Sequence, residues 1–85
     1  MRHRNGQYGD RNICGARIEA LRKKRCMKQT EIVRLLQKKG IVMGGSSYSQ
    51  LEGQLRSISD AELYALAEIF GISVEELLGK KQGTR

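Results

Sequence analysis

The sequence lacks proline and tryptophan, and its aromatic residues are limited to three tyrosines and one phenylalanine. The absence of proline removes the residue that most strongly interrupts a helix. Leucine, isoleucine, alanine, glutamate, lysine, arginine and glutamine make up much of the chain, and most of these are good helix formers. The composition therefore favours an all-α fold.

Cysteine and histidine are also scarce, because the chain has only Cys14, Cys26 and a single histidine, His3. If one helix separates the two cysteines, a rise of about 1.5 Å per residue places them roughly 18 Å apart. A disulfide needs Cα atoms within about 7 Å of each other, and two thiols with one imidazole do not complete a zinc site. We therefore expect reduced thiols, as in cytosolic proteins, and neither a metal nor another cofactor.

Long apolar runs are missing as well, so we expect no membrane-spanning segment and no signal peptide. With 85 residues, the chain offers one small domain and no room for a separate catalytic domain. The sequence contains no nucleophile–base pair, metal cluster or glycine-rich phosphate loop. We therefore expect a cytoplasmic protein that is not an enzyme and has no small-molecule substrate.

Positive charge, in contrast, is plentiful and unevenly distributed. Residues 1–58 contain 13 Lys and Arg against four Asp and Glu, a net charge of +9, whereas residues 59–85 have three against five, a net charge of −2. A strongly positive part of a small domain favours a polyanion as partner. The alternative interpretation of the charge is a solvated basic face that binds nothing.

The spacing of apolar residues predicts three helices in the first part of the chain. Cys14, Ile18 and Leu21 fall on one helical face, which indicates a helix from Ile13 to about residue 25. A second helix is predicted from near residue 29 until Lys38-Lys39-Gly40, where cations and a glycine form a stop signal. A third is predicted from about residue 45 to 53.

Two capping boxes predict the remaining helices. Ser59 precedes Glu62 by three residues, and Ser73 precedes Glu76 by the same distance, the pattern in which serine and glutamate side chains satisfy the first N–H groups of a helix. The fourth helix is expected to end at Phe70 and the short fifth near residue 78. Residues 1–12 and 80–85 lack periodicity, so we interpret them as a flexible basic arm and a polar tail around one domain at residues 13–79.

Five short signatures then follow one another in a fixed order. They are Arg22, Gln29, Ser49-Gln50-Leu51-Glu52, Leu63-Tyr64-Ala65-Leu66-Ala67, and Gly71-Ile72-Ser73 with Leu77. Together with the stretch CGARIEALRKKRCMKQTEIVRLLQ, they resemble the lambda-repressor/Cro-like (XRE) family over residues 13–78. The resemblance implies a five-helix lambda-repressor-like fold and a helix-turn-helix that binds double-stranded DNA, as in a transcriptional repressor.

The resemblance also implies roles for individual residues. The groove-facing positions of the third helix are Gly45, Ser46, Ser49 and Gln50. The positions that contact DNA phosphates are Gln29, Ser47 and Arg56. Arg22 and Glu52 match a partly buried ion pair that orients the third helix, whereas the alternative is two independent surface charges.

The sequence departs from the family pattern at three points. The connection between the second and third helices is about five residues longer than the usual tight turn. Lys28 occupies a position where a capping serine or threonine is usual, which weakens the start of the second helix by about 1 kcal/mol. Gly44 and Gly45 open the third helix, so base readout is expected to rest on Gln50, the serines and DNA shape.

Partner expectations follow from the same resemblance. A pseudo-palindromic operator with half-sites about 34 Å apart implies a homodimer, associated with the nucleoid when bound. We expect its surface at the fifth helix and the end of the fourth, with Ile69, Val74 or Leu78 exposed. The alternative hypothesis is an antitoxin-like or other protein-interaction module with weak DNA readout, which the glycine-rich start of the third helix favours.

Overall fold

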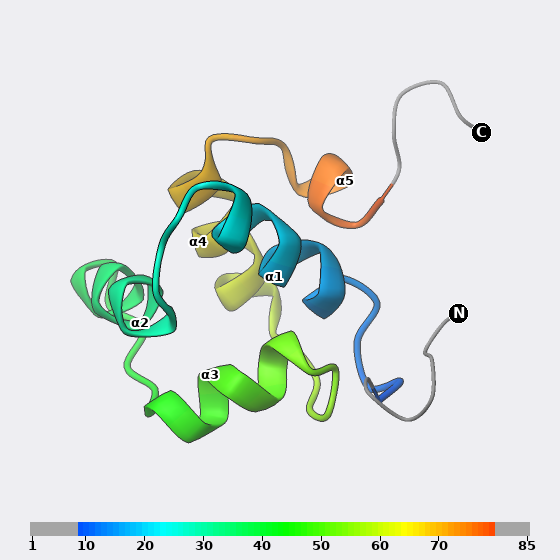
Figure 1. Cartoon of the computed structure of the whole chain (residues 1–85), viewed down its shortest axis with the longest axis horizontal. Coiled ribbons are helices and arrows are strands. Elements are labelled where there is room, and N and C mark those ends of the chain that lie inside the picture. The colour runs from blue at the N-terminus through cyan, green and yellow to red at the C-terminus, as the bar shows by residue number, and fades with distance from the viewer. Residues whose placement is uncertain (1–8, 80–85) are drawn as a thin grey trace.

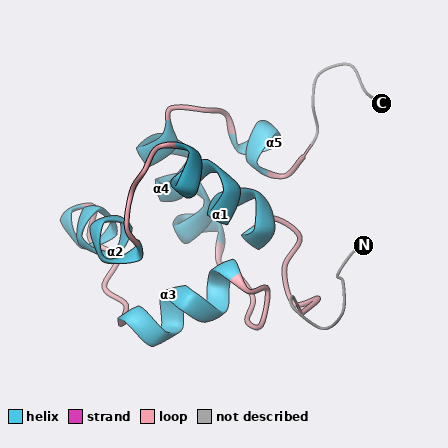
Figure 2. Ribbon diagram, in the orientation of Figure 1, coloured by secondary structure: helices cyan, strands magenta, loops and turns pink. Residues whose placement is uncertain are grey.

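Five helices form the part of the chain that the computed structural model describes, residues 9–79. They are α1 (Gly15–Lys24), α2 (Gln29–Lys38), α3 (Gly45–Glu52), α4 (Asp60–Phe70) and α5 (Val74–Leu77). These residues contain no strand, which confirms the all-α prediction for them. Figure 1 shows α3 along one edge of the molecule and α5 near the opposite edge, with α1 and α4 between them. Figure 2 shows that loops of varied length join the helices.

One apolar core holds all five helices together. Its buried residues come from every helix and from the residue before α1: Cys14, Ile18, Ile32, Leu36, Tyr48, Leu51, Ala65, Leu66, Ala67, Phe70 and Leu77. Helix α4 supplies four of them. None of the helices within residues 9–79 is both long and apolar enough to cross a membrane.

Helix α4 is defined by its own ends, as the sequence predicts. The Ser59 hydroxyl accepts a hydrogen bond from the Glu62 amide at 3.1 Å, and the Glu62 carboxylate accepts one from the Ser59 amide at 2.9 Å. Gly71 ends the helix with φ +68°, a left-handed conformation that glycine adopts without steric cost. The second capping box, at Ser73, starts α5 in the same way.

Helix α1 begins at Gly15, two residues later than predicted. Ile13 is 74% exposed and lies outside the helix. The start is set instead by Asn12, whose side-chain oxygen accepts hydrogen bonds from the amides of Cys14 at 3.1 Å and Gly15 at 2.7 Å. Such a cap satisfies N–H groups that have no partner within the helix.

Residues 9–12, which we name the N-terminal strap, belong to the folded domain rather than to the predicted flexible arm. The Gly9 amide donates to the Gly53 carbonyl at 2.8 Å, and the Arg11 amide donates to the Gln54 carbonyl at 2.9 Å. The strap is fixed because carbonyl groups after the C-terminal end of α3 accept these bonds. Residues 1–8 of the predicted arm and the predicted tail at 80–85 lie outside the described residues.

The two cysteines are free and have different environments. Cys14 is buried and Cys26 is exposed. Burial raises the pKa of the Cys14 thiol to about 11, so this thiol stays protonated at neutral pH. Cys26 has φ +56°, and this left-handed residue turns the chain between α1 and α2.

Candidate nucleic-acid interface

Helix α3 has one buried face and one exposed face. Tyr48, Leu51 and Glu52 point into the protein, with relative exposures of 0%, 0% and 2%. The opposite face carries the four residues predicted to face the DNA groove, and all four are exposed: Gly45, Ser46, Ser49 and Gln50. Ser47, predicted to contact a phosphate, is partly buried at the edge between the two faces. The exposed face is therefore uncharged, polar and built from small side chains, apart from Gln50.

This helix has little stability of its own. Its sequence, GSSYSQLE, is poor in strong helix formers, because glycine and serine rank below alanine and leucine in helix propensity. Gly44 precedes it and offers no side chain as a cap. Since an eight-residue helix without caps is unstable in isolation, contacts with the rest of the protein must hold α3 in place.

The first contact joins the inner face of α3 to α1. The Arg22 guanidinium donates to both oxygens of the Glu52 carboxylate, with Nε–Oε2 at 2.7 Å and Nη2–Oε1 at 3.1 Å. Both side chains are nearly buried, with exposures of 11% and 3%. The predicted ion pair is therefore present, and two hydrogen bonds join its partners. The hydrogen bond to Glu52 raises the pKa of Arg22, so the guanidinium keeps its positive charge.

Gln29 joins the same network from the start of α2. Its Nε2 donates to Glu52 Oε1 at 3.0 Å, so the residue predicted to touch a phosphate braces α3 in the free protein. The Tyr48 hydroxyl is buried nearby and has no hydrogen-bond partner among the described residues. Burial, together with the negative charge of Glu52, raises the pKa of Tyr48, so the phenol remains neutral.

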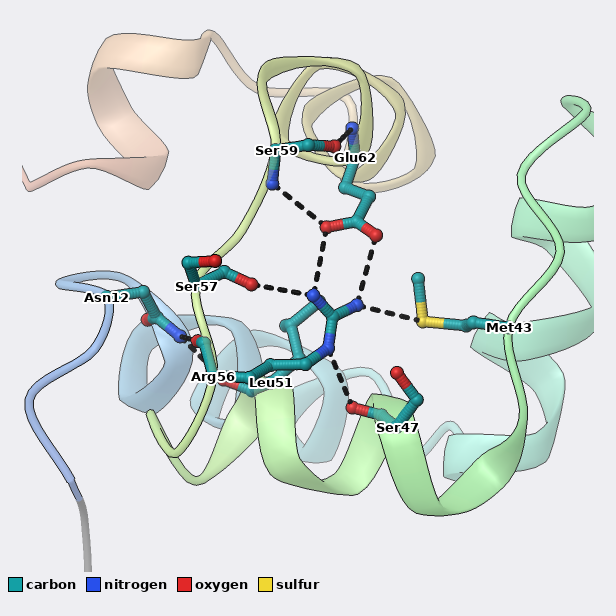
Figure 3. A network of polar contacts seen from close by, with 8 residues as sticks. All are labelled: Asn12, Met43, Ser47, Leu51, Arg56, Ser57, Ser59 and Glu62. Atoms are coloured by element: carbon teal, nitrogen blue, oxygen red, sulfur yellow. Dashed lines mark hydrogen bonds and ion pairs between the residues drawn. The ribbon is translucent and has the colours of Figure 1, made fainter.

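The second contact holds the loop side of α3 through Arg56 (Figure 3). Its Nη1 and Nη2 donate to the Glu62 carboxylate at 3.3 and 3.0 Å, and its Nε donates to the Ser47 carbonyl at 3.2 Å. Nη1 also donates to the Ser57 carbonyl at 2.6 Å, and Nη2 lies 3.6 Å from the Met43 sulfur. One guanidinium therefore ties together α3, the start of α4 and the connection between α2 and α3.

This network changes the interpretation of Arg56. The resemblance implied a phosphate contact, but all three guanidinium nitrogens have partners within the protein. Burial alone would raise the pKa of Glu62, yet the hydrogen bonds from Arg56 and Ser59 outweigh burial and hold that pKa below its usual value. Arg56 is thus a structural link in the free protein, paired with a carboxylate that is charged at neutral pH.

The third contact is the N-terminal strap at the far end of α3. Asn12 Nδ2 donates to the carbonyls of Leu51 at 3.1 Å and Arg56 at 2.8 Å, and Gln54 Nε2 donates to the Asn12 carbonyl at 2.5 Å. Gly15 brings α1 against the same place, because a Cβ there would overlap the carbonyl oxygen of Leu51. Sequence reasoning missed the strap, because Asn12 lies two residues before the cap position of α1, Cys14, and its partners are distant in the sequence.

Helix α3 carries no Lys or Arg, and the positive charge lies in the segments before and after it. Residues 9–58 contain eleven Lys and Arg against four Asp and Glu, whereas residues 59–79 contain five acidic residues and no Lys or Arg. Lys28 directly precedes Gln29, whose side chain contacts Glu52 of α3. Arg25 lies over the Phe70 ring at 5.5 Å, and Lys39 pairs with Glu68 at 3.0 Å, so these two cations lie near the end of α4.

The described residues contain no group of three or more histidine, cysteine or acidic side chains that could hold a metal ion. No protein-family model, curated protein or solved structure matches the chain significantly. The functional assignment therefore rests on the chemistry of α3 and its surroundings.

Proposed function

We propose that this chain binds double-stranded DNA by inserting the exposed face of α3 into the major groove, as a helix-turn-helix of the lambda-repressor/Cro-like kind. The observation that carries the proposal is a weak helix fixed at three places while its small polar face stays open. The major groove, about 12 Å wide, admits an α-helix. Small side chains allow the helix backbone to approach the base edges closely.

Gln50 is the residue that reads a base in this proposal. It is the longest side chain of the exposed face, and a glutamine amide makes two hydrogen bonds to adenine. The serine hydroxyls donate or accept and discriminate less sharply. Direct readout is therefore limited, and part of the specificity comes from the shape and deformability of the duplex.

The excess of positive charge supplies affinity independent of sequence. The first three helices and their flanks carry a net charge of +7 over residues 9–58, from eleven basic and four acidic residues. Neutralising phosphates releases condensed counterions, so binding weakens as salt rises, with a slope of about −0.9 per phosphate in a logarithmic plot. A chain of this kind acts as a transcriptional repressor when its site overlaps a promoter.

A homodimer is proposed for the operator-bound state. Of the three residues predicted at its surface, Ile69 and Val74 pack partly against the core and Leu78 is 37% exposed. Tyr64 on α4 is 61% exposed and adds a large apolar surface. A dimer with two recognition helices about 34 Å apart would select two-fold symmetric sites.

The test is selection of duplexes from a random pool, followed by titration of the best duplex at several salt concentrations. We expect a two-fold symmetric consensus and a binding constant that falls linearly with salt on logarithmic axes. Gln50→Ala should weaken binding to the selected duplex by about 1–3 kcal/mol and relax one base position. Gln37→Ala, which removes an exposed glutamine from the end of α2, serves as the matched control and should change nothing.

The second candidate is an antitoxin-like or other protein-interaction module, favoured by the exposed apolar side chains of Val42 (78%) and Tyr64 (61%). It predicts no consensus from the pool and little salt dependence.

If Gln50→Ala left duplex binding and its base preference intact, α3 would not be the element that reads the bases.

A further inference from the structure

We propose that Arg11, in the N-terminal strap, binds a backbone phosphate beside the C-terminal end of α3. This inference rests on the proposed DNA binding and adds a contact that the sequence pattern did not indicate. It replaces the phosphate contact expected from Arg56, whose guanidinium is occupied by Glu62 and by backbone carbonyls. Arg11 itself is exposed.

The backbone around Arg11 is held on both sides. Before it, the Gly9 amide donates a hydrogen bond to the Gly53 carbonyl at 2.8 Å. The amide of Arg11 donates to the Gln54 carbonyl at 2.9 Å. After it, the Asn12 side chain bonds to the carbonyls of Leu51 and Arg56. In Figure 1 this first described segment, in blue, runs beside the loop that follows α3. The Cα of Arg11 is therefore fixed next to the proposed interface, and only its side chain needs to be ordered on binding.

Electrostatics at this end of α3 favour an added cation. The last turn of the helix contains no basic residue, and the C-terminal end of a helix carries a partial negative charge that repels phosphate. The strap weakens this repulsion, because its amides occupy the carbonyls of Gly53 and Gln54. Glu52, the one acidic residue of α3, is already neutralised by Arg22. Arg11 then supplies a positive charge where the helix supplies none, next to the negative charge of Asp10 in the same strap.

Arg17 provides a matched control for the test. It is also an exposed arginine, but it lies on α1 against Gly79, after α5, and Figure 1 places α5 near the edge opposite α3. Removing either arginine lowers the net charge of the protein by the same amount. Only a residue in contact with a phosphate changes the number of counterions that binding releases.

The experiment measures duplex binding against salt for the wild-type chain, Arg11→Ala and Arg17→Ala, with thermal melting to verify folding. We expect Arg11→Ala to make the logarithmic slope shallower by about one, and to weaken binding equally for all sequences. Arg17→Ala should keep the wild-type slope. Equal slopes for the two variants would overturn this inference while leaving the proposed function in place, whereas no duplex binding by the wild-type chain would overturn both.

A second variant separates the position of Arg11 from its charge. A Cβ on Gly9 would overlap the Gln54 carbonyl oxygen, so Gly9→Ala displaces the strap while every charge is kept. We expect Gly9→Ala to reproduce the shallower slope of Arg11→Ala. A slope equal to the wild type for Gly9→Ala, in a variant that melts at a lower temperature, would show that placement by the strap is unnecessary and would contradict the proposal.

Discussion

Helices α3 and α4 differ in where their stability comes from. Helix α4 carries its own signals: a capping box at Ser59, helix-forming residues along its length, and Gly71 in a left-handed conformation at its end. Helix α3 begins after Gly44 without a side-chain cap and is rich in glycine and serine. Its stability comes from α1, α2, the strap and the link that Arg56 makes to the start of α4. The comparison teaches that the surface proposed to bind DNA lacks the residues that stabilise a helix, and that contacts with the rest of the protein compensate.

The largest effect is expected where α3 depends most on its surroundings, at the pair of Arg22 and Glu52. Glu52→Ala leaves the Arg22 guanidinium buried without its carboxylate, and we expect the free energy of unfolding to fall by about 3–5 kcal/mol. Chemical denaturation measures this change. Lys23→Ala, which removes only an exposed i,i+4 pair with Glu19, should cost no more than about 0.5 kcal/mol. Equal losses for the two variants would contradict the conclusion that the buried pair of Arg22 and Glu52 holds α3 in place.

The next effect is expected at Arg56, which links the two helices. Arg56→Ala removes hydrogen bonds to Glu62 and to the Ser47 carbonyl, and we expect a loss of about 1–3 kcal/mol in the free energy of unfolding. Exposed Arg34 on α2 provides the control, since Arg34→Ala should stay within about 0.5 kcal/mol of the wild type.

The loss at Arg56 should depend on pH in a defined direction. The folded-state pKa of Glu62 lies below the ordinary glutamate value of 4.5, so the ionised carboxylate stabilises the folded state above that pH. This stabilisation disappears as the pH falls through the folded-state pKa. The difference between wild type and Arg56→Ala should therefore be complete at neutral pH and shrink in acid. A difference that stayed constant down to strongly acidic pH would exclude the ion pair as its source.

A smaller effect is expected from the cap of α4. Ser59→Ala removes the hydroxyl that accepts from the Glu62 amide, and caps of this kind contribute about 1 kcal/mol. Thermal unfolding measures the loss, and Ser59→Asp, which retains an acceptor, should restore most of it. If Ser59→Ala destabilised the protein as much as Glu52→Ala, local capping would not distinguish α4 from α3.

The smallest effect sharpens the comparison by giving α3 what it lacks. Gly44 has φ −81°, which other residues adopt, and a Cβ there would meet no atom within 4 Å. Gly44→Ser adds a capping hydroxyl, and we expect a gain of a few tenths of a kcal/mol, because glycine is itself a tolerable cap. Repeated denaturant titrations resolve such a gain. A loss of stability would contradict the open space found around the Cβ position of Gly44.

Features encoded by neighbouring residues were predictable from the sequence. The helix bounds of α4, the two capping boxes and the glycine that ends α4 depend on residues within one or two turns of each other. The ion pair between Arg22 and Glu52 spans 30 residues, and its prediction came from the family resemblance and not from local pattern. The exposed face of α3 followed from helical spacing once Tyr48 and Leu51 were placed inside.

The surroundings of α3 were not predictable in the same way. An arginine in a loop suits a phosphate and a carboxylate equally well, so the pairing of Arg56 with Glu62 depends on where the fold places the first turn of α4. The strap likewise depends on contacts between residues 39 and 44 positions apart, those of Asn12 with Leu51 and Arg56. Its residues lack apolar periodicity, which made them resemble a loose terminus.

The crossing of α1 and α3 at Gly15 has a consequence for adaptability. Because main chain meets main chain there, with no room for a Cβ beside the Leu51 carbonyl, tilting one helix must carry the other along. Interiors packed this closely transmit displacement instead of absorbing it. In the proposed complex the protein would therefore stay rigid, and the duplex would supply the bending and groove adjustment needed for a close fit.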